Sequence, residues 1–143
     1  MTMTRRFDYI DHTADIIIKA SGDTLAEAFA AAAEGMFAVI TDEAEIQPNQ
    51  RETIEIESID REGLLVNFLS ELIVMHEAQN VVIGQIAVEL LSDTRLRADL
   101  GIEPFDDDRH AGGSQVKGVS YHMLEIEDAA GDQPAGIQVL LDI

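Results

Sequence analysis

Residues 22–41, GDTLAEAFAAAAEGMFAVIT, decide the fold. Thr24 and Glu27 have the spacing of a capping box, in which each side chain accepts a hydrogen bond from the other residue's backbone N–H. A helix is therefore predicted to begin at Thr24 and to end near Thr41. Its apolar residues recur at spacings of three and four, which places one stripe against a core: Leu25, Ala28, Phe29, Ala32, Met36, Val39 and Ile40.

The sequence on either side of this helix alternates as strands do. Upstream, residues 5–10 and 16–20 predict two short strands around a polar turn at 11–15. Downstream, residues 50–58 alternate between polar side chains and isoleucines, which predicts a strand with one buried face.

A second helix is predicted to begin after Asp60, whose side chain can cap its first turn. Its apolar stripe is wide, so we expect the helix to be largely buried: Leu64, Leu65, Phe68, Leu69, Leu72, Ile73 and His76. The remaining chain predicts a hairpin over 81–91 and 94–101, a long loop over 102–115, and strands over 116–126 and 137–143.

The predicted element order, ββαβαββββ, is typical of a single α+β domain spanning residues 1–143. Because most of these strands are joined by turns, we expect a mostly antiparallel mixed sheet. Parallel pairing stays an alternative for the strands on either side of each helix. We expect both amphipathic helices to pack on one face of that sheet.

The composition excludes several classes of site. A chain of 143 residues that is 46% hydrophobic fits one domain with its own core. No apolar run approaches the ~18 residues of a membrane span, and the first residues carry no apolar signal-peptide segment, so we expect a cytoplasmic protein. The absence of cysteine excludes disulfides, thiolate catalysis, Cys-ligated zinc and iron–sulfur clusters.

The charge is strongly negative, with 9 basic against 28 acidic side chains and a net charge of −19. Phosphate recognition relies on Lys and Arg, so direct nucleic-acid binding is not expected. Cations or a basic protein surface are the favoured partners. The alternative is that the acidity serves only solubility in a salty cytoplasm.

The C-terminus offers a candidate cation site. Asp142 interrupts apolar strand sequence, and the chain ends one residue later at Ile143. The two carboxylates would repel each other, and a hard cation such as Ca²⁺ or Mg²⁺ would relieve the repulsion. The alternative is that Asp142 points into water at a fraying terminus.

Two acidic turns are further candidates. Residues 11–15, Asp-His-Thr-Ala-Asp, place two carboxylates and the His12 imidazole between predicted strands, although their side chains could equally cap turn amides. Asp106, Asp107 and Asp108 precede Arg109 and His110, and this loop could bind a metal or be a solvated surface. It lacks the ligand spacing of an EF-hand.

Two residues of the strand over 116–126 also stand out. Lys117 opens this strand in a very acidic chain, where it could bind a carboxylate, contact an acidic group on a partner, or form a structural ion pair. His122 is expected to be a buried histidine with a satisfied hydrogen bond. The sequence contains no GxSxG, HExxH, P-loop or GxGxxG motif, so it indicates no enzyme class.

Six segments, taken in order from about residue 7 to the last residue, carry a family resemblance. They are His12-Thr13-Ala14-Asp15-Ile16; Gly22-x-Thr24-Leu25-x-Glu27-Ala28-Phe29 with Ala32-Ala33; Leu64-Leu65-Val66-x-Phe68-Leu69-x-Glu71-Leu72; Gly101-Ile102-Glu103-Pro104 with Asp106; Val116-Lys117-Gly118-Val119-Ser120-Tyr121-His122; and Leu141-Asp142-Ile143. Together they resemble the archease family. The departures are mild: Ile17, Gly118 and Ser120 stand where the family more often has Gly, Ala and Thr.

The resemblance implies a small α+β protein that is not itself an enzyme. It would activate the GTP-dependent RNA-splicing ligase of tRNA splicing by promoting guanylylation of the ligase's active-site histidine and supporting multiple turnover. The resemblance places a divalent cation, Ca²⁺ first with Mg²⁺ or Mn²⁺ as alternatives, among Asp15, Asp142 and the terminal carboxylate of Ile143. It assigns partner activation to Lys117. We expect His12 and His122 to support the ligands.

Two alternatives stay open. One is a chaperone-like modulator of another tRNA-modifying enzyme, such as a methyltransferase. The other is a small metal-dependent hydrolase that uses His12, Asp15 and Asp142 with a metal-activated water.

Overall fold

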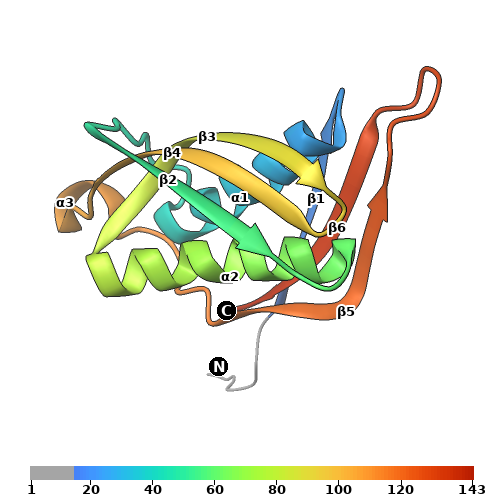
Figure 1. The fold of residues 1–143 in the computed structure, drawn as a ribbon. Coiled ribbons are helices and arrows are strands. Elements are labelled where there is room, and N and C mark those ends of the chain that lie inside the picture. Colours follow the sequence, from blue (N-terminus) through green and yellow to red (C-terminus); the bar gives the residue numbers. More distant parts are fainter. Residues whose placement is uncertain (1–14) are drawn as a thin grey trace, which may run out of the picture.

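The computed structural model describes residues 15–143, which form six strands and three helices (Figure 1). The elements follow one another in this order: β1 (Asp15–Gly22), α1 (Leu25–Thr41), β2 (Gln50–Glu57), α2 (Arg61–Gln79), β3 (Val81–Ser92), β4 (Arg95–Pro104), α3 (Asp107–His110), β5 (Gly118–Glu127) and β6 (Ala135–Asp142). The order agrees with the predicted α+β class. The strand predicted over residues 5–10 lies outside the described residues.

Both long helices begin where their capping residues predict. In α1, the Thr24 hydroxyl accepts from the Glu27 backbone N–H at 3.1 Å, and Glu27 accepts from the Thr24 backbone N–H at 3.2 Å. In α2, the Asp60 carboxylate accepts from the Gly63 backbone N–H at 2.7 Å. Each pairing satisfies a backbone donor that has no partner within the helix.

The strands form two separate antiparallel sheets, in the orders β1-β6-β5 and β2-β4-β3. The mostly antiparallel pairing that the sequence predicts is confirmed, but the strands form two sheets where one mixed sheet was predicted, and residues 15–143 contain no parallel pair. The hairpins explain the difference. β4 pairs with β3 and also with β2, whereas β6 pairs with β5 and returns to β1, so the strands on either side of each helix join different neighbours.

The two long helices lie between the two sheets. The sequence had led us to expect both helices on one face of a single sheet. α1 contacts β1 and β6 of the first sheet and β3 of the second, while α2 contacts β5 of the first sheet and β2 and β3 of the second. The Phe29 and Phe68 rings stack at 6.5 Å between centroids and join the helices in the core. Two sheets and two helical stripes thus enclose one continuous core.

The region predicted as a loop over 102–115 is partly ordered into regular structure. β4 continues to Pro104 because β3 begins at Val81, opposite it. The short helix α3 follows, with the Asp106 carboxylate accepting from the Asp108 backbone N–H at 2.8 Å. No helix within residues 15–143 is long and apolar enough to cross a membrane.

Candidate functional site

Asp15 and Asp142 are brought together by the pairing of the first and last strands. Asp15 lies directly opposite Asp142 in the antiparallel β1–β6 pair. Residues opposite each other in such a pair share one face of the sheet, with their Cβ atoms about 4.5–5.5 Å apart. Two residues separated by most of the chain therefore place their carboxylates on one face at the same end of the sheet.

The third strand of this sheet adds Lys117 and Gly118 to the same end. Gly118 pairs with Asp142 on the side away from Asp15. The Lys117 backbone N–H donates to the Asp142 carbonyl at 2.7 Å, while the Lys117 side chain is exposed. A Cβ added at Gly118 would have only the Asp142 carboxylate within 4 Å, at 3.9 Å, so the space beside this carboxylate is open.

Ile143 follows Asp142 at this end of the sheet. Ile143 is half-buried and packs against the core, which holds the last residue beside Asp142. No cluster of three His, Asp or Glu side chains with metal-binding geometry occurs among residues 15–143. The side-chain donors at this end are the carboxylates of Asp15 and Asp142, and carboxylate oxygens are the ligands that hard cations such as Ca²⁺ prefer.

The two histidines expected to support these ligands have different outcomes. His12 lies outside the described residues. His122 is exposed, so the expectation of a buried histidine was wrong. Val119 packs against the core, so Ser120 and His122 belong to the opposite, outward face of β5, and alternation alone accounts for the exposure of His122. The His122 backbone N–H donates to the Ser120 hydroxyl at 2.9 Å.

A buried charge cluster that the sequence did not predict lies where the acidic loop meets the end of β4. Glu103 is 5% exposed and accepts from Arg109 at 2.8 Å and from the Gln47 backbone N–H at 2.5 Å. The fully buried His110 lies 3.2 Å from the same oxygen through Nε2, and its Nδ1 accepts from the Asp106 backbone N–H at 2.8 Å. Nε2 also lies 3.1 Å from the Arg109 guanidinium, so Glu103, Arg109 and His110 are in mutual contact.

Glu103 is ionised because its partners outweigh its burial. Burial alone would raise the pKa of this carboxyl. The hydrogen bonds from Arg109 and Gln47, together with the positive charge of Arg109, hold the pKa below its usual range. Glu103 interrupts apolar strand sequence as Asp142 does, and that pattern could have revealed it.

The acidic loop contributes to this cluster. Asp106 caps α3, and Arg109 and His110 turn back to Glu103. Asp107 and Asp108 are exposed, as the solvated-surface interpretation predicts.

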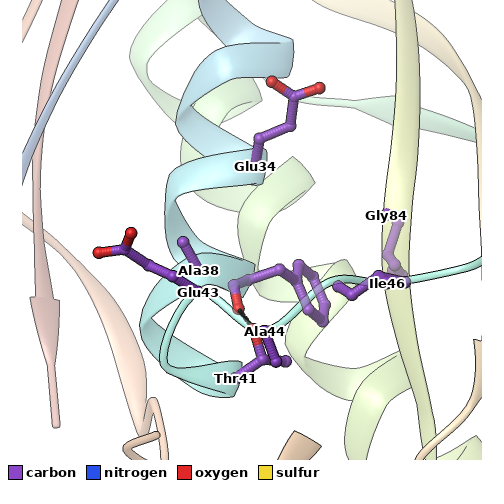
Figure 2. Close-up of a pocket in the computed structure, with 9 residues that line it drawn as sticks. Glu34, Ala38, Thr41, Glu43, Ala44, Ile46 and Gly84 are labelled. Atoms are coloured by element: carbon purple, nitrogen blue, oxygen red, sulfur yellow. Dashed lines mark hydrogen bonds between the residues drawn. The ribbon is translucent and has the colours of Figure 1, made fainter. Parts of the chain in front are cut away.

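A cavity of about 310 Å³ lies beside the C-terminal half of α1 (Figure 2). Buried apolar side chains, Phe37 and Ile83, form part of its wall, and Glu34 and Glu43 are exposed at its rim. The two carboxylates point in different directions (Figure 2). The Thr41 hydroxyl is committed to the Phe37 carbonyl at 2.8 Å. The lining therefore offers no nucleophile with an adjacent base.

Comparisons with known proteins all lead to one family. The model of the Archease protein family matches residues 7–143. Protein archease of Thermococcus gammatolerans is 37% identical over 126 residues, covering 86% of this chain and 89% of the relative. Protein archease of Methanosarcina mazei is 34% identical over 143 residues, covering 97% of each.

Solved structures share the fold. The solution structure of protein 1598 from Methanobacterium thermoautotrophicum superposes with a TM-score of 0.65 at 31% identity, covering 93% of this chain and 95% of that one. The crystal structure of a Thermotoga maritima archease, described as a possible chaperone, superposes with a TM-score of 0.60 at 17% identity over the whole of both chains. The family match over residues 7–143 and the identities above 30% show that the chain belongs to the archease family.

Proposed function

We propose that this protein is an accessory activator of a GTP-dependent RNA-splicing ligase in tRNA splicing. It promotes guanylylation of the ligase's active-site histidine and supports multiple turnover. The observation that carries the proposal is the juxtaposition of Asp15, Asp142 and Lys117 at one end of a sheet, in a chain of the archease family.

The carboxylates at this end would hold a divalent cation, Ca²⁺ by preference. Asp15, Asp142 and the terminal carboxylate of Ile143 are its ligands in this proposal. The cation would neutralise their mutual repulsion and present positive charge to a partner's anionic groups. The open space beside Gly118 gives solvent and a partner access to Asp142.

Lys117 supplies a charge of the opposite sign next to these ligands. Its backbone is tied to Asp142 and its side chain is exposed, so its position is fixed while its ammonium group can reach a partner. An ammonium group in this place suits a carboxylate or phosphate in the ligase pocket. We therefore assign Lys117 to activation and not to stabilisation of the fold.

The net charge of −19 supports a protein partner over a direct RNA partner, because tRNA phosphates would be repelled. A protein that acts on another protein also suits the description of the Thermotoga maritima relative as a possible chaperone. That description favours, as a second candidate, a chaperone-like modulator of a different tRNA-modifying enzyme. In either case we place the action in the cytoplasm.

One pair of assays separates the proposal from the metal-dependent hydrolase. The purified protein is tested with Ca²⁺, Mg²⁺ and Mn²⁺ for phosphodiesterase and phosphatase activity, and then added with GTP to the purified ligase. We expect no hydrolysis and faster histidine guanylylation. Hydrolysis by the protein alone, or a ligase that is guanylylated at the same rate without it, contradicts the proposal.

A further inference from the structure

A bulge in β5 exposes side chains that a regular strand would not. Ser120 pairs with Leu140 and Glu125 pairs with Gln138, so the four residues 121–124 lie opposite a single residue of β6. Within the bulge, Met123 has a φ of 62°, a left-handed conformation that is unfavourable for a residue other than glycine. The Gln138 side chain donates to the Met123 carbonyl at 2.9 Å and holds this conformation.

The bulge lies beside the start of α2, where β5 turns sharply in Figure 1. A Cβ added at Gly63, in the first turn of α2, would lie 3.4 Å from the Tyr121 hydroxyl. The same Cβ would meet the side chains of Ser58 and Asp60, the residues on either side of Ile59. Tyr121 and Ile59 therefore belong to one corner of the molecule.

This corner exposes unusually large apolar side chains. Ile59 is 93% exposed, Tyr121 60% and Met123 48%. Met123 belongs to the same bulge as Tyr121, and we call these three residues the apolar corner. They contribute little to the protein's own core, and the backbone at Met123 costs free energy to maintain. Aromatic and large apolar side chains gathered on a surface are typical of the centre of a protein–protein contact.

The charged side chains around the apolar corner indicate which kind of partner would bind there. Asp60, Glu62 and Glu125 are exposed beside it, and the nearby Arg61 is paired with Asp128 at 2.7 Å. An acidic rim and a net charge of −19 disfavour a second copy of this chain, RNA and an anionic lipid surface. They favour a protein surface with an apolar recess bordered by Lys and Arg.

Two residues of the apolar corner, Tyr121 and Met123, lie on the same strand as Gly118 of the candidate site. Gly118, beside Asp142, and Tyr121 lie on the same strand three residues apart, about 10 Å at the rise of an extended chain. We propose that Ile59, Tyr121 and Met123 dock onto an apolar, basic-rimmed recess of the same enzyme that Lys117 activates. This inference rests on the proposed function and divides the surface in two: the apolar corner supplies affinity, and the end with Lys117 supplies activation.

The test compares binding with activation for full-length variants and the purified ligase. The docking variants are the double variant Ile59→Ser/Tyr121→Ser and, separately, Met123→Gly, which suits the positive φ and keeps the fold. The control is Val74→Ser, because Val74 is 53% exposed on α2 and lies outside the corner. Calorimetric titration gives Kd, and guanylylation at saturating protein gives the maximal rate.

We expect Kd to rise at least tenfold for the double variant, to rise by a smaller factor for Met123→Gly, and to be unchanged for Val74→Ser. The maximal guanylylation rate should equal that of the wild type for all three.

If the wild type binds and activates the ligase while both docking variants keep the wild-type Kd, the docking inference is wrong and the proposed function stands. If the wild type neither binds nor activates, the proposed function itself fails. Self-association that the docking variants abolish would identify a second copy as the occupant and overturn the inference.

Discussion

Glu103 shows how strongly a single buried charge depends on its partners. Its carboxylate is held by Arg109 and His110 of α3 and by the backbone of Gln47, which come from two separate parts of the chain. A buried carboxylate without such partners would be protonated or would destabilise the fold. The cluster thereby ties the segment before β2 and the short helix α3 to the end of β4.

This arrangement predicts a pH-dependent loss of stability. Because the pKa of Glu103 is lowered in the folded protein, its contribution to stability is present above the unfolded-state pKa and is lost as pH falls through the folded-state pKa. Glu103→Gln should therefore be less stable than the wild type at pH 7, and the difference should shrink as the pH falls below about 4. Urea unfolding across this range measures it.

The exposed Glu127 provides the control, and Glu127→Gln should follow the wild type at every pH. A constant difference between Glu103→Gln and the wild type from pH 7 to acid would show that the variant acts through packing and not through the charge.

At the scale of secondary structure, the helices could be predicted from the sequence and the sheet pairing could not. Capping side chains act within a few residues, so the capping roles of Thr24 and Asp60 could be predicted from the local sequence alone. Strand pairing depends on contacts across the whole chain, and the pairing of β1 with β6 has no local pattern that indicates it. The β5 bulge was hidden for the same reason, because residues 116–126 still alternate in the sequence.

The capping box of α1 predicts a measurable loss when it is removed. Thr24→Ala should lower the free energy of unfolding by about 1 kcal/mol, because the Glu27 N–H loses its acceptor. For a domain of this size, that corresponds to a fall of about 3 °C in Tm. Thermal unfolding followed by circular dichroism detects it. Thr24→Ser keeps the acceptor and should melt close to the wild type; equal losses for Ala and Ser would disprove the capping explanation.

The paired ends of β1 and β6 predict a cation-dependent stability. Ca²⁺ at a hundredfold excess over its Kd should raise the free energy of unfolding of the wild type by about 2.7 kcal/mol. Asp15→Asn, Asp142→Asn and a short neutral tail after Ile143 should each reduce this gain, since each removes or displaces one proposed ligand. Melting temperatures with and without Ca²⁺ measure the effect.

Asp93 lies exposed in the turn between β3 and β4, so Asp93→Asn should keep the full gain. If the tailed protein also keeps the full gain, the terminal carboxylate is not a ligand.

At the scale of the whole molecule, the strong acidity is the property that most restricts the partner. With a net charge of −19, the isolated protein should show no binding to tRNA at micromolar concentration and physiological salt. A gel shift tests this. A retarded band that weakens steeply as salt is raised would mean that a basic surface contacts the RNA directly.

The candidate site was only partly predictable at this scale. The sequence marked Asp142 and Lys117 as unusual, and the family resemblance joined them to Asp15. The structure adds that Asp15 and Asp142 are direct partners across two strands and that the Lys117 backbone bonds to Asp142. Neither contact follows from periodicity, because each joins strands whose pairing is set by the complete fold.

The most direct test of the central claim is the rate of ligase histidine guanylylation with saturating wild-type protein, Lys117→Ala or Lys19→Ala. Lys19 is the other lysine of the chain and is likewise exposed, on β1. We predict the wild-type rate with Lys19→Ala and a rate at least tenfold lower with Lys117→Ala, with unchanged circular dichroism for both. Equal activation by the two variants, or unfolding of Lys117→Ala, would contradict this prediction.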